Sequence, residues 1–260
     1  MALSRVLIVV PTLGQRLDHL KACLASISSQ TISGNIVIVS PLLPEVELLA
    51  REFGAQLIED PGSQTKAINA GVSHAIKDSN YQYVNWLGDD DLLEPGSLEI
   101  TTQALDNHPN ATVAYGACRY IDGDGQELWI SRAGKWAPRV LSWGPDLIPQ
   151  PGMLVRMDAW QAVGGVDESY RFAFDLDLLL KLKKLGPLVD TRTIVSSFRW
   201  HADSLTVGDR TTNLQESERA KRSALSPTAQ KLAWLWERPV RGATRLAAWE
   251  VNRRAAKKVT

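Results

Sequence analysis

The chain has 260 residues, of which 44% are hydrophobic and 22% charged, a composition typical of a globular protein. Its formal net charge is zero, which gives the whole chain no bias toward nucleic acid. No stretch approaches the roughly 20 consecutive apolar residues of a membrane span, and the N-terminal residues lack the features of a signal peptide. We therefore expect a cytoplasmic protein.

The charge is unevenly distributed along the chain. Residues 227–260 contain eight basic and two acidic residues, which leaves the rest of the chain with a net charge of −6. Three tryptophans, Trp234, Trp236 and Trp249, lie among these basic residues. A basic, Trp-rich tail is typical of a segment that docks on the inner face of a membrane. A tail that packs on the body or forms an oligomer contact is the alternative.

The first half of the chain alternates short apolar strands with amphipathic helices. We predict strands at 6–10, 36–39, 55–58 and 83–87, and helices at 15–29, 44–53 and 64–77. This alternation indicates an α/β fold with a mostly parallel sheet and right-handed crossovers. Ligands of such sheets bind beyond the carboxyl ends of the strands, where Pro11-Thr12 and the segment 88–91 are expected.

The pattern changes after Pro109. Residues 112–121 and 126–130 predict a β-hairpin, and residues 132–149 a long loop. Short helices are expected at 158–163 and 175–185, followed by a strand at 195–201. We expect one domain over 1–226, with halves at 1–109 and 110–226, followed by the tail at 227–260.

Three adjacent carboxylates follow the predicted strand 83–87. Asp89, Asp90 and Asp91 repel one another, so a positive partner is expected, and Mn²⁺ or Mg²⁺ is the strongest candidate. Such an ion can bridge the phosphates of a nucleotide diphosphate and neutralise the charge that grows as a sugar leaves. A solvated acidic turn before the helix that begins near Glu94 is the alternative.

Several segments, in order, resemble a known family. NWLGDDDLLEPGSLE is similar to the aspartate-containing metal motif of glycosyltransferase family 2, an inverting family with the GT-A fold, which is Rossmann-like. RVLIVVPTLGQRLDHLKACLASISSQ and GSQTKAINAGVSHA resemble its opening strand and its third helix. VAYGACRYIDGDG, PQPGMLVRMDAWQAVGGVDESYRFAFDLDLLLKL and FRWHADSLT follow in the family's order, so the resemblance covers about residues 4–206.

The resemblance implies transfer of a sugar from a nucleotide-diphosphate sugar to an acceptor hydroxyl, with inversion. It implies a glycan or lipid-linked acceptor and a role in cell-surface polysaccharide or glycolipid synthesis. Asp175 matches the family's catalytic base, and Asp177 a neighbour that orients the loop or caps the helix. From the residues alone, Asp175 can equally be a simple N-cap of the helix 175–185.

Further candidates surround these aspartates. We expect the metal ligands to be Asp90, with Asp91 and Asp89 beside it, together with His201, which can also be an ordinary hydrogen-bonding residue. The nucleotide-sugar is expected to contact Pro11, Thr12, Arg16, Asp60, Lys66, Asn69, Gly88 and Asp89. The acceptor side is expected to comprise Gln150, Pro151, Gly152, Asp177 and Arg199.

Two further expectations concern aromatic residues. Trp136 and Trp143 either stack on a sugar ring or are buried anchors of the loop 132–149. Strand alternation at 198–201 predicts that Phe198 and Trp200 face the core, while Arg199 faces the site.

The chain departs from the family's pattern at three positions. Gly88 stands where the family often has aspartate, Phe174 where it often has an acid, and Ser40 opens a turn that lacks the usual acid near the nucleotide base. These departures motivate an alternative function, a non-catalytic nucleotide- or sugar-binding protein on a degenerate transferase scaffold. A nucleotidyltransferase is disfavoured, because PTLGQRLDHL is not the Gly-rich, basic loop that such enzymes carry.

Overall fold

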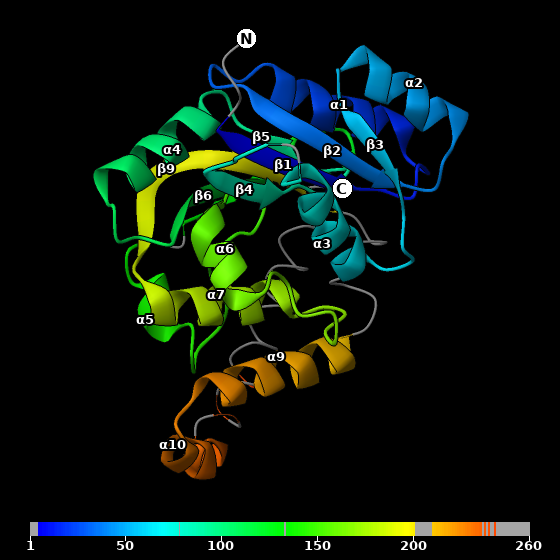
Figure 1. Ribbon diagram of the computed structural model, residues 1–260. Coiled ribbons are helices and arrows are strands. Elements are labelled where there is room, and N and C mark those ends of the chain that lie inside the picture. The colour runs from blue at the N-terminus through cyan, green and yellow to red at the C-terminus, as the bar shows by residue number, and fades with distance from the viewer. Residues whose placement is uncertain are drawn as a thin grey trace.

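The computed structural model describes residues 5–77, 79–132, 134–200 and 210–235, together with residues 237, 239 and 242. A single mixed sheet runs through the centre of the molecule, with strand order β3-β2-β1-β4-β8-β6-β9-β5 and β7 paired to β6. Helices cover both faces of this sheet (Figure 1). The predicted α/β fold is confirmed.

The amino-terminal half forms the parallel part of the sheet. Its strands are β1 (Val6–Pro11), β2 (Gly34–Ser40), β3 (Gln56–Glu59) and β4 (Tyr83–Trp86). Its helices are α1 (Leu17–Ser28), α2 (Pro44–Glu52), α3 (Gln64–Ala75) and α4 (Ser97–Asn107). All neighbouring pairs among the four strands are parallel, as the alternating pattern predicts.

The second half extends the same sheet with strands of both directions. Its strands are β5 (Leu92–Leu93), β6 (Val113–Ile121), β7 (Glu127–Ser131), β8 (Leu154–Arg156) and β9 (Leu188–Arg199). Its helices are α5 (Ala137–Val140), α6 (Met157–Val163), α7 (Phe174–Leu185), α9 (Arg210–Ala224) and α10 (Pro227–Leu232). The predicted hairpin is confirmed, since β6 and β7 pair antiparallel.

Alternating residues of β1 build two cores. Val6, Ile8 and Val10 pack toward α1, α2 and α4, whereas Leu7 and Val9 pack toward α3, α6 and α7. Every one of these side chains is fully buried, which explains why the strand is apolar throughout and shows no polar alternation. On the second face α3 approaches closely, because a Cβ at Gly71 would lie only 2.5 Å from Val9 Cγ1.

Several elements differ from the sequence-based expectations. The short strands β5 and β8 were not predicted, because two or three residues carry no periodicity. The last strand begins at Leu188 instead of residue 195, since the polar residues 190–193 do not alternate with apolar ones. The loop 132–149 contains the one-turn helix α5.

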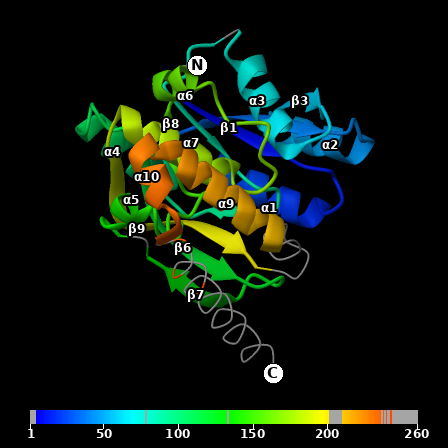
Figure 2. The ribbon, with the colours of Figure 1, turned by 90° about the horizontal axis from the view of Figure 1, so that it is seen from below.

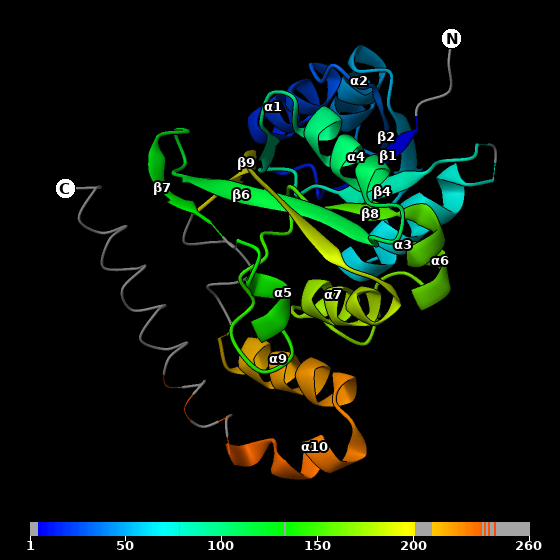
Figure 3. The same ribbon diagram turned by 90° about the vertical axis from the view of Figure 1, so that its left-hand side faces the viewer.

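Helix α9 adds a third layer to the molecule. It lies against α7, on the side of α7 that faces away from the sheet (Figures 1 and 3). Seen from below, α9 crosses over α7 and leads into α10 (Figure 2). Of the predicted tail, α10 and the next few residues are described, whereas Trp236 and Trp249 lie outside the described residues.

Candidate functional site

The carboxyl ends of β1 and β4 meet at one edge of the sheet, as predicted. The Leu87 N–H donates to the Val9 carbonyl at 2.9 Å, which brings the segments after the two strands together. The Thr12 hydroxyl then donates to Asp89 Oδ2 at 2.5 Å and accepts the N–H of Gly14 at 3.0 Å. Thr12 is buried, so it holds the acidic turn and offers little surface to a ligand.

Arg16 provides positive charge for two of the three aspartates. Its two terminal nitrogens lie 3.2 Å from Asp89 Oδ1 and 3.0 Å from Asp90 Oδ2. Burial raises the pKa of Asp89, while the Thr12 hydrogen bond and the Arg16 charge act in the opposite direction. The sequence-based argument that a metal must compensate the acidic turn is therefore incomplete, because part of the compensation comes from Arg16.

Asp91 is the most enclosed of the three. Its side chain is buried, and its Oδ1 accepts the backbone N–H of Arg199 at 3.1 Å. Burial, followed by the neighbouring Asp90 charge, holds the pKa of Asp91 well above its ordinary value. Since both Asp89 and Asp91 are buried, the alternative of a solvated acidic turn is wrong.

Two carboxylates converge beside Gly88. A Cβ built at this glycine would lie 2.8 Å from Asp91 Oδ2 and 3.1 Å from Asp90 Oδ1. Both carboxylates thus border the space that a side chain at this position would fill. Within the part of the chain that the structure describes, no group of three His, Cys, Asp or Glu residues is arranged to hold a metal ion. His201, the fourth predicted ligand, lies outside that part.

Asp175 lies in the first turn of α7. Its Oδ1 accepts the N–H of the next residue, Leu176, at 2.7 Å, and the residue is half-buried. Burial raises the pKa of Asp175 to about 6, against the opposing effect of this N–H donor. The N-cap of α7 is Ala173, so the alternative of Asp175 as a simple N-cap is wrong.

Asp146 and Tyr120 are further acidic groups near the candidate site. Asp146 is exposed, and the protein atoms around it, followed by the Asp175 charge, raise the pKa of its carboxyl to about 7. Burial raises the pKa of the Tyr120 hydroxyl, and the charges of Asp91 and Asp146 add to the effect of Cys118. The Asp175 charge thus acts on Asp146, and the Asp91 charge acts on Tyr120.

The sequence analysis did not single out Asp146 or Tyr120. Asp146 lies in the aperiodic loop 132–149, and Tyr120 in a hairpin strand whose pattern indicates only structure. The one available signal is that long loops are often functional, which does not single out a residue.

The predicted donor-side residues differ in what their side chains contact. Asp60 follows β3 at the same edge of the sheet, where its carboxylate accepts the Gly62 N–H at 3.0 Å, and Lys66 is exposed on the first turn of α3. The prediction that Asn69 contacts the nucleotide-sugar is corrected by the structure. Its amide donates to the Val166 carbonyl at 2.8 Å and to Glu168 at 3.0 Å, so both amide hydrogens anchor the loop before α7.

The prediction that the segment 150–152 lines the acceptor side is also corrected by the structure. Pro151 and Gly152 are buried, and a Cβ at Gly152 would lie 2.4 Å from Val195 Cγ2. The Gln150 amide donates to the Trp86 carbonyl at 2.7 Å and to Asn85 at 3.3 Å. The segment packs between β4 and β9, so it serves the interior of the protein.

Asp177 and Arg199 are held within the protein as well. Asp177 is buried and pairs with Lys181 at 2.6 Å, and Lys181 also reaches Asp167 in the preceding loop at 3.4 Å. The Arg199 guanidinium is buried and donates to the carbonyls of Asp90, Asp122 and Gly123 at 2.8–3.1 Å. The expectation that Arg199 faces an acceptor is therefore wrong, because this side chain joins the acidic turn to the hairpin through hydrogen bonds.

The aromatic residues likewise differ from expectation. Phe198 and Trp200 are only half-buried and join Tyr120 and Trp129 in an aromatic cluster beside the hairpin. Trp136 and Trp143 are 59% and 49% exposed, so neither is a buried anchor of its loop. Stacking of either ring on a sugar stays a prediction.

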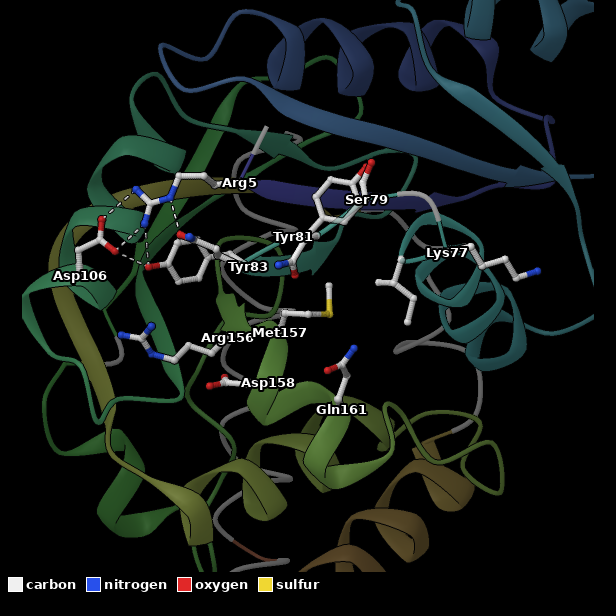
Figure 4. Close-up of a pocket in the computed structure, with 13 residues that line it drawn as sticks. Arg5, Lys77, Ser79, Tyr81, Tyr83, Asp106, Arg156, Met157, Asp158 and Gln161 are labelled. Carbon is white, nitrogen blue, oxygen red and sulfur yellow. Dashed lines mark hydrogen bonds and ion pairs between the residues drawn. The ribbon is translucent and has the colours of Figure 1, made fainter. Parts of the chain in front are cut away.

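A separate cavity of about 730 Å³ opens at the opposite edge of the sheet (Figure 4). It lies beside Arg5, which precedes β1, and Tyr83, which begins β4. Arg5 donates to Gln82 at 2.5 Å and to Asp106 at 2.9 Å, and Tyr83 donates to the same carboxylate. The Arg156 guanidinium donates to the carbonyls of Leu105, in the last turn of α4, and of Ala111, just after this helix. Because these charges satisfy one another, the acidic edge is the better candidate site.

Comparisons with known proteins show what the chain as a whole is similar to. No protein-family model matches the chain. An uncharacterized glycosyltransferase of Rickettsia conorii is 24% identical over 200 residues, covering 72% of this chain. Chondroitin synthase of Escherichia coli is 24% identical over 148 residues, covering 55% of this chain. The chain spans only 32% and 21% of the lengths of these two relatives.

Solved structures share the fold. TarS of S. aureus, residues 1–349 in complex with UDP-GlcNAc, superposes with a TM-score of 0.64 at 14% identity, covering 88% of this chain and 70% of that TarS fragment. The mannosyltransferase PcManGT of Pyrobaculum calidifontis, in complex with GDP-Man and Mn²⁺, gives 0.64 at 14% identity, covering 98% and 79%. The chain therefore has a glycosyltransferase fold.

Proposed function

We propose that this chain transfers a sugar from a nucleotide-diphosphate sugar to an acceptor hydroxyl, with inversion at the anomeric carbon. One observation carries the proposal. The acidic turn 89–91 lies at the carboxyl end of β4, beside the carboxyl end of β1, where ligands of such sheets bind. The relatives named above support the same class of reaction.

Asp175 is the proposed general base. A base that takes the proton of the acceptor hydroxyl needs a pKa close to the working pH, and the value of about 6 meets this requirement better than that of an ordinary aspartate. In an inverting transfer the deprotonated hydroxyl attacks the anomeric carbon on the face opposite the leaving diphosphate. The Asp175 Oδ1 receives the Leu176 N–H, which orients the carboxylate while the other oxygen can take the proton.

The acidic turn fits a divalent cation in part. Mg²⁺ and related ions are typically held by one or two carboxylates, with substrate phosphates and waters completing the shell. Asp90 and Asp91, whose oxygens converge beside Gly88, provide such a pair, and Asp89 is fixed beside them by Thr12. A bound Mn²⁺ or Mg²⁺ would supply charge neutralisation for the leaving diphosphate. Arg16, already next to these carboxylates, is placed to contribute to the same task.

A donor panel tests the proposal. We expect one nucleotide-diphosphate sugar, in the presence of Mn²⁺, to raise the melting temperature by about 5–10 °C at a hundredfold excess over Kd. The same donor should be hydrolysed slowly without acceptor and consumed faster with the correct acceptor. UDP-GlcNAc and GDP-Man are the first donors to test, because they are bound in the two structural neighbours.

The panel also separates the alternative function. Metal-dependent binding with neither hydrolysis nor transfer, across all donors and acceptors, would favour a non-catalytic sugar-binding protein. Gly88 and Phe174, which replace acids of the family pattern, motivate this alternative.

The C-terminal segment is proposed to dock on an anionic membrane surface near a lipid-linked acceptor. Within the described ranges, no helix has both the length and the apolarity needed to cross a bilayer. Leu232, Trp234 and Leu235 are 48%, 57% and 52% exposed, and the sequence of 227–260 contains eight basic residues. Exposed aromatic and basic side chains together favour the membrane interface.

Vesicle sedimentation checks this docking. We expect the protein to sediment with vesicles that contain anionic lipid, and to be released as the salt concentration rises. Trp234→Ser should weaken binding several-fold, whereas Leu48→Ser, at a leucine of α2 that is 66% exposed, should not. Equal binding to neutral vesicles, or equal losses in both variants, would contradict docking through this segment.

A further inference from the structure

The backbone just before Asp175 is held by a carboxylate from another helix. Glu216, on α9, accepts the N–H of Arg171 with both oxygens at 3.0 Å. Its Oε2 also accepts the N–H of Phe172 at 2.7 Å and that of Ala173 at 3.1 Å. These three residues directly precede α7, whose N-cap is an alanine and offers no side-chain acceptor. Glu216 therefore caps the helix that carries the proposed base.

Two other residues of α9 contact the same region. The Arg219 guanidinium lies 3.8 Å from the ring centroid of Tyr170 and donates to the Ser169 carbonyl at 2.9 Å. Lys221 is half-buried, and its charge acts on Asp146. Arg219 thus joins Glu216 in contacting the loop 169–173, and the Lys221 charge acts on the Asp146 carboxyl.

The charge state of Glu216 agrees with this role. Burial of the carboxylate would raise its pKa, yet the N–H donors of residues 171–173 and the Arg219 charge together hold the pKa below its ordinary value. The side chain is therefore ionised at neutral pH, which makes its hydrogen bonds to the backbone charge-assisted and strong.

We propose that Glu216 is a positioning residue for the reaction, which sets the place of the Asp175 carboxylate through the backbone of residues 171–173. The inference rests on the proposed function of Asp175 as base. Asp175 lies only two residues beyond Ala173, so a shift of that backbone moves the carboxylate directly. Displacement of a reacting group by about 1 Å can lower the rate about a hundredfold.

The test compares Glu216→Ala and Glu216→Gln with Gln215→Ala, an exposed neighbour on the same helix. For Glu216→Ala we expect kcat to fall about a hundredfold while KM for the donor stays nearly unchanged. Formate, a small carboxylate that can occupy the vacated backbone N–H groups, should restore part of the activity. Glu216→Gln keeps the size of the side chain and one acceptor oxygen, so its effect should be smaller and in the same direction.

A second readout does not depend on turnover. Carbon-13 NMR of labelled aspartate carboxyls follows the titration of Asp175 in the full-length protein. We expect Glu216→Ala to move its midpoint down from about 6, because burial raises the pKa of Asp175 and water gains access when the backbone of residues 171–173 is released. Gln215→Ala should leave the midpoint in place.

These outcomes separate the two proposals. An unchanged midpoint in Glu216→Ala, or a wild-type kcat, would overturn the positioning role while leaving the transferase function intact. Absence of turnover by the wild-type protein with every donor would overturn the proposed function, whereas the midpoint would still show whether Glu216 sets the environment of Asp175. If Glu216→Ala does not fold, kcat and the Asp175 midpoint of Glu216→Gln test the positioning role instead.

Discussion

Replacement of Asp175 by asparagine is expected to lower the transfer rate by about 10²–10⁴-fold, the usual contribution of a positioned general base. Asparagine keeps the size of the side chain and an oxygen that can accept the Leu176 N–H, but it cannot take a proton from the acceptor hydroxyl. Donor binding should be little changed, because the acidic turn 89–91 is untouched. Initial rates with the donor identified in the panel, and donor affinity by calorimetry, check both expectations.

The fold of this variant should be at least as stable as that of the wild type at neutral pH. The unfolded chain releases the Asp175 proton near pH 3.9, whereas the folded protein holds it up to about pH 6. A folded pKa above the unfolded value means that stability is lost as pH rises through this window, and that the loss persists above it. Asparagine removes this cost, so lost activity at pH 7 cannot be attributed to unfolding.

Asp158→Asn is the matched control. Asp158 lies in the first turn of α6, and its Oδ1 accepts the N–H of the next residue at 2.7 Å, the same local contact that Asp175 makes. It is exposed at the opposite edge of the sheet, beside the cavity of Figure 4. Wild-type activity in Asp175→Asn, or an equal loss in Asp158→Asn, would remove Asp175 from the role of base.

The same assignment predicts a pH dependence. A base works only when deprotonated, so kcat/KM should fall as pH drops through about 6, by close to tenfold per pH unit below that value. Because Asp175 and Asp146 interact, the fall reports the pair and not a single residue. A rate that stays constant from pH 8 to pH 4.5 would contradict a carboxylate base at this position.

Much of the amino-terminal half was predictable, because each buried strand is a short apolar run that ends at a polar turn. Val6–Pro11 and Gly34–Ser40 show this pattern, and the parallel order of β1 to β4 follows from the intervening helices. The second half was less predictable. The pairing of β8 between β4 and β6 depends on contacts between distant residues, and its three residues contain no signal of their own.

The carboxylates of the site were predictable from the sequence, but the residues that contact them were not. Position after a strand marks Asp89–Asp91, and the family pattern marks Asp175. That Arg16 pairs with two of the aspartates, and that Arg199 turns inward to carbonyl groups, results from tertiary packing. Glu216 illustrates the limit most clearly, because it lies 41 positions after Asp175 on a helix whose sequence gives no indication that it caps α7.

Replacement of Asp90 by asparagine is expected to lower transfer at least about a hundredfold and to weaken Mn²⁺ binding. Loss of outer-shell partners of a metal ion commonly costs 10–100-fold, and loss of a ligand should cost no less. Asp90 is a better choice than Asp91 for this test. The Asp91 carboxylate supports the backbone of β9 through Arg199, whereas the Asp90 side chain contacts Arg16, which is 40% exposed and can adjust.

Two measurements distinguish a lost metal ligand from a lost ion pair with Arg16. Manganese affinity, followed by electron paramagnetic resonance in the presence of the nucleotide diphosphate, should fall in Asp90→Asn. Asp124→Asn, which removes an exposed carboxylate from the hairpin turn, controls for the change in total charge and should retain both activity and affinity. If Asp90→Asn loses activity but binds Mn²⁺ as the wild type does, the acidic turn acts through Arg16 and not through a metal ion. Retention of both would place the chemistry of this protein elsewhere.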